Sequence, residues 1–251
     1  MRMGQGLNAS SEISFRPGNW SSMKEGVDMM AQPLPNIPHR IARDRHESWD
    51  PEQIKFATPG NAGGTKTAVG DGRVFMVGWS TSPDCLDPHI EILCIDSRGS
   101  WDKKFGDDGR VIVKNTSGCH PCIGESPVIR TLAGGSIIVG ANYVTALLNV
   151  ETATLLKFDA LGFPVKTFGK EGRVEIKLPD GTASTALKDC HILSNGRILV
   201  AGHALAQDEM KHGFVAIFNP DGTPSSKFGT AGILLVNGQH ADTEFDALRK
   251  A

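Results

Sequence analysis

The stretch that decides the fold is NPDGTPSSKFGTAG at residues 219–232, and the chain contains it three times in related form. The earlier copies are DSRGSWDKKFGDDG at 96–109 and DALGFPVKTFGKEG at 159–172. In each copy, Asp or Asn stands nine residues before a Phe-Gly pair, Gly stands six before it, and a further Gly follows. The Phe-Gly pairs lie 63 and 60 residues apart. A repeat of about 61 residues therefore organises the chain from about residue 62 onward.

We call each of these three stretches, 96–109, 159–172 and 219–232, a box. Upstream of each box, a turn sequence leads into a short apolar run that ends in Gly. In the third copy the turn is Asn195-Gly196-Arg197, and the whole copy predicts strands at 185–193, 197–204, 213–218 and 232–236. An Asn-Gly or Asp-Gly pair at this position predicts a two-residue type I′ turn between the first two strands. The equivalent turns are Asp71-Gly72-Arg73 and Gly134-Gly135-Ser136, and the apolar runs are Val74–Gly78, Ile137–Gly140 and Ile198–Gly202.

The residues of the box predict the turn between the third and fourth strands. We expect the leading Asp or Asn to accept hydrogen bonds from nearby backbone amides. The Gly six before Phe is expected to take an unusual φ, and the Phe to fill the hydrophobic layer.

Four antiparallel strands in every 60 or so residues predict an all-β, β-propeller-like fold. We place the blades at about 64–118, 124–180 and 184–238, with a closing strand of a partial fourth at 243–248. A closed propeller usually needs at least four blades. Three arrangements remain open: two chains sharing a six-bladed ring, an irregular fourth blade made by both ends of the chain, or an open stack. We favour the first, a homodimer.

The repeat is similar to the bacterial delta-60 repeat family. The third copy carries the resemblance best, in LSNGRILVAG at 193–202 followed by the box at 219–229. The second copy departs from the pattern at Ala133–Ser136. The resemblance covers about 62–251 and implies a propeller-like architecture, but it brings no catalytic residues with it.

Residues 1–57 differ from the rest and are predicted to form an extended N-terminal arm, ahead of a repeat domain at 58–251. The run Pro33–Pro38 favours polyproline II, and the arm has no sustained apolar period. Gln53–Ala57 offers a second closing strand. The prolines of the arm are Pro17, Pro33, Pro35, Pro38 and Pro51.

Charge and hydropathy exclude several classes of partner. The net charge is −2 and the pI about 6.4, so neither nucleic acid nor an anionic membrane is an expected partner. No run approaches the ~20 apolar residues of a membrane span, and the N-terminus lacks the apolar core of a signal peptide. We expect a cytoplasmic protein, or one exported without a classical signal. An odd number of cysteines favours free thiols: Cys85, Cys94, Cys119, Cys122 and Cys190.

Cys119-His120-Pro121-Cys122 is the candidate metal site, and we expect it in the connection between the first two blades. Thiolate and imidazole are good zinc ligands, and two residues between cysteines let both sulfurs reach one ion. A structural zinc needs about four ligands, and only Cys190-His191 offers more. A redox pair normally opens a helix, which this context does not predict. Two free thiols without a ligand are the interpretation we favour, so no cofactor is expected.

The candidate ligand-binding residues are those that depart from the repeat after the second strand of each copy. We expect them on loops around a central channel, where propellers usually bind ligands. The aromatic members are suited to stacking on a sugar. The alternative is that these positions differ only because loops vary. They are Trp79, Asn142, Tyr143 and His203.

No nucleophile elbow, zinc-protease motif or phosphate-binding loop is present. The sequence therefore favours a non-enzymatic protein that holds a glycan, a small polar ligand or a protein. One alternative is a metal-dependent hydrolase or lactonase, which needs convergent polar groups on the inner strands. Another is a structural subunit that engages a partner through its arm. The inner-strand candidates are Glu125, Lys188, Asp189 and His191.

Overall fold

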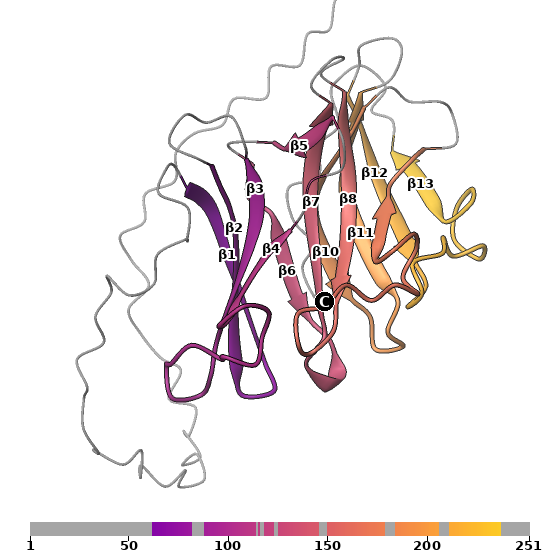
Figure 1. Ribbon diagram of the computed structural model, residues 1–251. Helices are drawn as coiled ribbons and strands as arrows, with labels where there is room; N and C mark the ends of the chain where they lie inside the picture. The colour runs from indigo at the N-terminus through magenta and orange to yellow at the C-terminus, as the bar shows by residue number, and fades with distance from the viewer. Residues whose placement is uncertain are drawn as a thin grey trace, which may run out of the picture. The chain divides into compact units, whose positions relative to one another are not determined.

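A computed structural model describes residues 62–81, 88–113, 115, 118–122, 125–145, 150–178, 184–205 and 211–236. Apart from one 3-10 turn, the regular elements in these ranges are strands, which form three antiparallel sheets (Figure 1). The predicted all-β class is confirmed. The predicted arm (1–57) and closing strand (243–248) lie outside the described residues.

The first sheet has the order β1 (Ala62–Gly70), β2 (Arg73–Ser80), β3 (His89–Ile95) and β4 (Arg110–Val113). Each strand pairs with its neighbour in sequence, as in a meander. Strand β3, HIEILCI, is buried along its whole length because both of its faces are covered.

The third sheet repeats this order with β10 (Ser184–Ile192), β11 (Ile198–Leu205), β12 (Lys211–Phe218) and β13 (Ile233–Val236). Its strand bounds agree with the prediction for the third copy to within two residues.

The second sheet differs in its first strand, which is in two pieces. Both β5 (Cys119–Pro121) and β6 (Val128–Thr131) pair with β7 (Ile137–Thr145), which is followed by β8 (Glu151–Phe158) and β9 (Arg173–Glu175). The second sheet therefore begins at Cys119, ahead of the predicted boundary at 124. Cys119–Pro121 is a strand of this sheet and not part of a connection between sheets.

The hairpin turns correct the prediction of one shared turn type. Asp71 and Gly72 join β1 to β2 with φ of +50° and +70°, as the type I′ prediction required. In the third sheet, however, the amide of Leu193 donates to the carbonyl of Arg197 at 2.8 Å, which leaves a three-residue loop, Ser194–Gly196. Gly196 alone has a positive φ there, as in a type I turn followed by a left-handed Gly. In the second sheet, the 3-10 turn η2 (Ala133–Gly135) takes this place.

The second strands continue past the glycines at which the apolar runs were expected to end. Gly140 lies within β7 and Gly202 within β11. A Cβ at Gly202 would lie 2.1 Å from the Ala186 carbonyl, and one at Gly140 would lie 2.9 Å from a Leu187 methyl. These glycines allow a close approach of neighbouring strands and do not end the strand.

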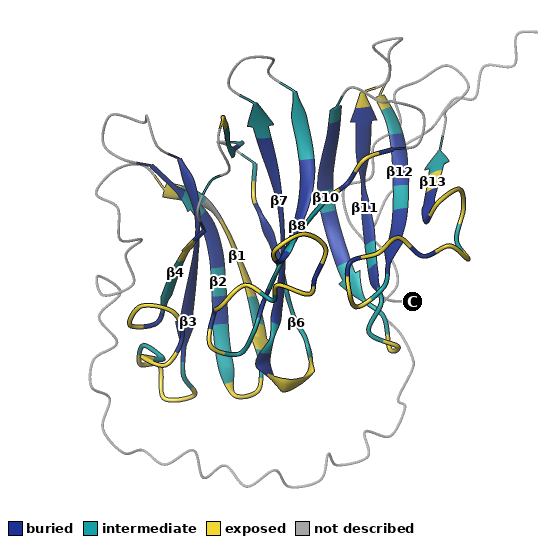
Figure 2. Ribbon diagram, turned by 45° about the vertical axis from the view of Figure 1, so that its right-hand side comes forward, coloured by how far each residue is buried: buried dark blue, intermediate teal, exposed yellow. Residues whose placement is uncertain are grey.

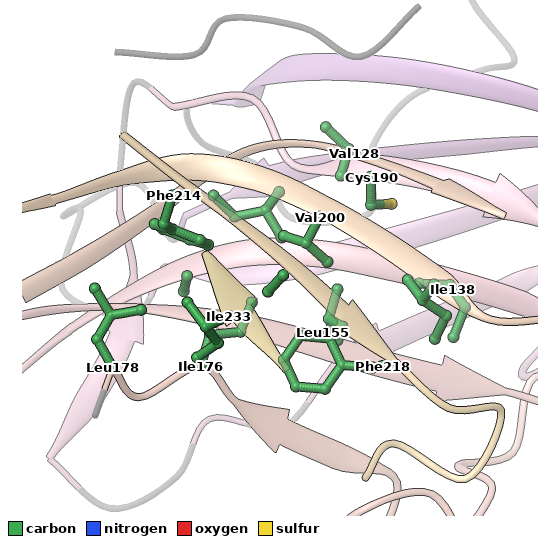
Figure 3. Packing of buried hydrophobic residues seen from close by; sticks show 14 of the residues in the cluster. Val128, Ile138, Leu155, Ile176, Leu178, Cys190, Val200, Phe214, Phe218 and Ile233 are labelled. Carbon is green, nitrogen blue, oxygen red and sulfur yellow. The ribbon is translucent and has the colours of Figure 1, made fainter. Parts of the chain in front are cut away.

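The sheets pack against one another through two apolar layers. Figure 2 shows that much of the central strands is buried. Strand β7 contributes to both, because successive side chains point to opposite faces. Ile137 and Val139 pack toward the first sheet, with Phe75 and Phe105, while Ile138 packs toward the third sheet. Figure 3 shows the layer between the second and third sheets. Its labelled side chains include Leu155, Ile176, Val200, Phe214 and Phe218.

The repeated box behaves as predicted in the first two copies. The Oδ1 of Asp159 accepts from the amides of Leu161 and Phe163, both at 2.9 Å, and Asp96 makes the equivalent bonds. Phe105 and Phe168 are fully buried. The third copy departs from this, because the Asn219 side chain bonds the Thr223 hydroxyl and Phe228 is only partly buried.

No helix in the part of the chain that the structure describes is long and apolar enough to cross a membrane.

Candidate functional site

The first strand of each sheet is irregular at the same level. Strand β1 shifts register between Gly63 and Lys66, and β10 shifts between Leu187 and Asp189. In the second sheet, the break between β5 and β6 falls at this position. A bulge changes the direction in which a side chain points. The three irregularities therefore bring polar side chains to a region where regular strands would pack apolar ones.

A cavity of about 260 Å³ lies between the second and third sheets at this level. A second cavity, of about 250 Å³, shares Glu125 and Lys188 with it and extends to Lys66 on the first sheet. The side chains that line the first of these two cavities are mostly charged or polar. They are Glu125, Glu151, Ser184, Ala186, Lys188, His203, Leu205 and Lys211.

Glu125 is held in place by two donors. The Lys188 Nζ lies 3.0 Å from its Oε1, and the Asn142 amide donates to its Oε2. Asn142 is itself fixed across the sheets, since its Oδ1 accepts from the Leu187 amide at 2.8 Å and its Nδ2 donates to the Leu187 carbonyl at 3.1 Å. The pair Glu125–Lys188 is thus preorganised, and both side chains keep a quarter to a third of their surface exposed.

The two carboxyl groups of the cavity, those of Glu151 and Glu125, differ in pKa and therefore in charge near pH 7. Burial raises the pKa of Glu151 to about 7, and the neighbouring charge of Glu125 raises it further in the same direction. Burial also opposes ionisation of Glu125, but hydrogen bonds from Asn142 and Lys188 outweigh it and hold the pKa of Glu125 below its usual value. At neutral pH the cavity therefore contains one fixed carboxylate beside a carboxyl group that titrates near pH 7.

The raised pKa of Glu151 predicts a pH-dependent effect of Glu151→Gln on stability. A carboxyl group with a raised pKa in the folded state binds its proton more tightly there, so its contribution is lost as the pH rises through about 7. Glutamine mimics the protonated form. We expect the melting temperature of the variant to match that of the wild type near pH 4, to exceed it increasingly between about pH 4.5 and 7, and to stay above it by a constant amount at higher pH. Thermal denaturation across this range measures the difference, and a difference that does not change between about pH 4.5 and 7 would contradict the assignment.

One of the four predicted ligand-binding residues lines this cavity, and a second contacts a residue that lines it. His203 lines it directly, and Asn142 orients Glu125 from below the surface. Both lie within strands, β11 and β7, and not on loops as predicted. The reason is that these strands run on past their glycines and stay paired with the next strand.

The other two, Trp79 and Tyr143, lie away from the cavity, in the apolar layer between the first and second sheets. They too are strand residues and not loop residues. Tyr143 is 2% exposed and faces the side of β7 opposite to Asn142. The Arg173 guanidinium lies 4.1 Å from the centre of its ring. This side chain is therefore covered, and it presents no free ring to a sugar.

The candidate metal ligands do not come together as a set of three. Cys119 and His120 are adjacent residues of β5, so their side chains point to opposite faces. Within the described ranges, no three His, Cys, Asp or Glu side chains form a cluster that could hold a metal ion. Cys119 and Cys122 are free thiols. Burial raises the pKa of Cys122, and the charges of Glu151 and Glu125 raise it further, which makes this thiol a weak nucleophile.

Of the inner-strand candidates, Glu125 and Lys188 form the site, whereas the other two lie elsewhere. Asp189 forms an ion pair with Arg130 across the second and third sheets. His191 lines a separate cavity of about 340 Å³ between the first strands.

A buried polar network in the first sheet resembles a catalytic triad in composition only. The Ser80 Oγ lies 2.9 Å from the His89 Nε2 and 3.0 Å from the Glu91 Oε2, and Arg110 pairs with Glu91. In a triad the imidazole stands between the hydroxyl and the carboxylate, whereas here the hydroxyl is central. Ser80 is also fully buried. The arrangement is a satisfied core network.

Glu151, Ser184 and Lys211 were not predicted from the sequence. These residues are the first residues of β8, β10 and β12. No motif marks them, because the bulge that opens the cavity between them depends on pairing and not on a local sequence.

The chain matches no family model, no curated protein and no solved structure.

Proposed function

We propose that this chain is a propeller-like binding protein that holds a small polar ligand without transforming it. Three sheets of like topology, stacked in order, and the resemblance to the delta-60 repeat support the propeller-like architecture. The ligand site is the cavity lined by Glu125, Glu151, Lys188 and His203.

The observation that carries the proposal is the fixed pair Glu125–Lys188, which is preorganised and still partly exposed. A carboxylate and an ammonium group held side by side can bind a ligand that carries both charges, or one rich in hydroxyl groups. The volume of about 260 Å³ lies just below the range of about 300–1,000 Å³ that ligand pockets usually have, so the ligand must be small. An amino acid or a single sugar fits this chemistry and size.

The test is thermal denaturation of the wild-type protein against a panel of amino acids and monosaccharides. A ligand that binds the folded state raises the melting temperature by mass action. We expect at least one compound to raise it, and Lys188→Ala to abolish the rise. Lys103→Ala is the matched control, because Lys103 is an exposed lysine in a turn of the first sheet, away from the cavity.

Calorimetric titration of the same compounds then gives the affinity directly. A panel without any effect, or a rise that survives Lys188→Ala, would overturn the assignment of this cavity.

A second candidate function, acid–base hydrolysis, is favoured by one observation. Glu151, with a pKa of about 7, stands beside ionised Glu125, and pairs of carboxyl groups with separated pKa values serve as acid and base in glycosidases. Chromogenic glycosides and esters test it: turnover that is lost in Glu151→Gln would favour an enzyme over a binding protein.

A further inference from the structure

Neighbouring sheets meet through one contact that the chain makes twice. The amide that follows the buried Phe donates to a carbonyl two residues after the Asp or Asn of the next box. These bonds run from Gly106 to Leu161 and from Gly169 to Asp221, each at 2.8 Å. We call each of these contacts between neighbouring sheets a joint. The same positions of the repeat form both joints.

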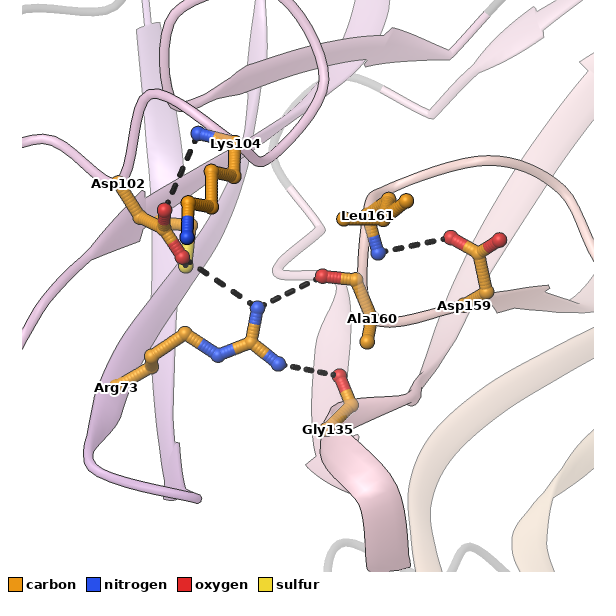
Figure 4. Close-up of polar contacts among 8 residues, drawn as sticks. Arg73, Asp102, Lys104, Gly135, Asp159, Ala160 and Leu161 are labelled. Atoms are coloured by element: carbon orange, nitrogen blue, oxygen red, sulfur yellow. Dashed lines mark hydrogen bonds and ion pairs between the residues drawn. The ribbon is translucent and has the colours of Figure 1, made fainter.

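A cation of the earlier sheet reaches the preceding carbonyl in both joints. At the first joint, Arg73 donates to the Ala160 carbonyl at 2.7 Å and also to the Gly135 carbonyl at 3.0 Å (Figure 4). At the second joint, Lys157 donates to the Pro220 carbonyl at 2.9 Å. Ala160 and Pro220 are equivalent residues of the box.

An apolar contact completes each joint. Gly162 and Gly222 have φ of +84° and +87°, and a Cβ on either would lie 2.7 or 2.6 Å from a methyl of Val111 or Val174. The glycine turn of one sheet therefore packs directly on the fourth strand of the sheet before it.

The third sheet carries the donor half of this joint without a partner. Gly229 has the same conformation as Gly106 and Gly169, with φ of +50° against +58° and +55°, yet its amide has no backbone acceptor among the described residues. Leu234 stands where Val111 and Val174 stand, and it is 47% exposed.

Arg197 is the third-sheet equivalent of Arg73. Its Nε is buried and has no hydrogen-bond partner, and its side chain forms no ion pair within the described ranges. A buried guanidinium nitrogen without an acceptor is costly. Arg197, the equivalent of the arginine that closes the first joint, is therefore present on the outer face of the third sheet.

The first sheet carries the acceptor half. Asp96 folds its turn as Asp159 does, and Gly99 has a φ of +82°, like Gly162 and Gly222. The carbonyls of Ser97 and Arg98 occupy the positions of the two acceptors in the internal joints, and neither accepts a backbone hydrogen bond in the part of the chain described.

We propose that the outer face of the third sheet docks on the exposed turn 97–99 of the first sheet of a second copy of this chain. Gly229 then donates to the Arg98 carbonyl of the other copy, Arg197 to its Ser97 carbonyl, and Leu234 packs on its Gly99. The two surfaces lie at opposite ends of the row of sheets (Figure 1), and closed propellers contain about four to eight blades. Three sheets therefore do not bring them together within one chain.

A contact between two different surfaces is head-to-tail, so two copies that exchange both surfaces form a closed ring with two identical joints. We choose a second copy of the chain as the partner because it carries the matching half of the joint that the chain already makes twice internally. The proposal does not depend on which ligand the cavity holds.

Light scattering after size exclusion tests the proposal on the full chain. We expect the wild type at twice 26.9 kDa, and Arg197→Ala and Leu234→Glu each at 26.9 kDa. Phe163→Glu is the matched control, since Phe163 is an exposed apolar residue (60%) outside the proposed joint. It is expected to keep the wild-type mass.

Circular dichroism shows whether each variant retains its sheets. Arg197→Ala is the variant less expected to misfold, because the buried Nε of Arg197 has no hydrogen-bond partner among the described residues. A wild type at the mass of one copy at all concentrations would overturn the proposal. A dimer that persists in both folded variants would overturn it equally.

Discussion

Replacement of Phe168 by alanine is expected to lower the free energy of unfolding by about 3–5 kcal/mol. Phe168 is fully buried between the second and third sheets, where Ile176 and Phe214 belong to the same cluster. A Cβ at Gly222 would lie 3.1 Å from its ring, so the next sheet covers it closely. Removal of the ring leaves a cavity that rigid strands on both sides cannot fill, which adds to the lost transfer free energy. Urea denaturation measures the change.

Phe163→Ala is the control for this prediction. Phe163 belongs to the same turn but is 60% exposed, so its loss is expected to change stability by no more than about 0.5 kcal/mol. Phe228→Ala should fall between the two, since Phe228 is only partly buried. A loss for Phe168→Ala as small as that for Phe163→Ala would contradict the role of the repeated Phe as a core residue.

Gly222→Ala is the second change with a large expected effect. Gly222 has a φ of +87°, a conformation that costs an L-residue about 1–2 kcal/mol. The added methyl would also lie 2.6 Å from the Val174 Cγ2 and 3.0 Å from the Gly169 amide nitrogen. Overpacking of this kind costs about 1–3 kcal/mol. We expect a total loss of roughly 2–5 kcal/mol in urea denaturation, because the methyl forces the second and third sheets apart.

Gly134→Ala separates the two contributions. Gly134 has a φ of +74°, but a Cβ there would meet nothing within 4 Å. Its replacement is expected to cost only the conformational part, about 1–2 kcal/mol. Equal losses for the two variants would show that the joint between sheets is not closely packed at Gly222.

The sequence predicted the strands well wherever the repeat is regular. The spacing of Phe105, Phe168 and their glycines predicted both the turn conformation and the buried ring, because Gly and Phe each suit one position of that turn. It did not predict the turn before β11. Asn195-Gly196 is compatible with a two-residue turn or a three-residue turn, and the pairing of Ile192 with Ile198 decides between them.

The candidate site was predicted less completely, for a physical reason. Asn142 and His203 were found because they depart from the repeat, and Glu125 and Lys188 because both were predicted to be polar residues of inner strands. Lys188 lies on β10, whereas Glu125 lies in the break between β5 and β6. Trp79 and Tyr143 depart from the repeat equally, but they point toward the first apolar layer. Which face a strand residue occupies depends on register, and a bulge such as that at Lys188 changes the register without a sequence signal.

The repeated joint also explains how stability is distributed along the chain. When each sheet contacts only its neighbours, stability is approximately a sum of the sheets and their joints. The two internal joints are hydrogen-bonded, closely packed and built from the same positions, so they are expected to unfold together with the sheets they connect.

Amide hydrogen exchange at Gly106, Gly169 and Gly229 is the most direct test of this repeated joint, and the Arg197→Ala variant is the form in which to measure it. The amides of Gly106 and Gly169 each donate across a joint at 2.8 Å, whereas that of Gly229 has no backbone acceptor in the described part of the chain. We predict slow exchange at Gly106 and Gly169 and fast exchange at Gly229. Equal exchange rates at the three glycines would contradict the joint.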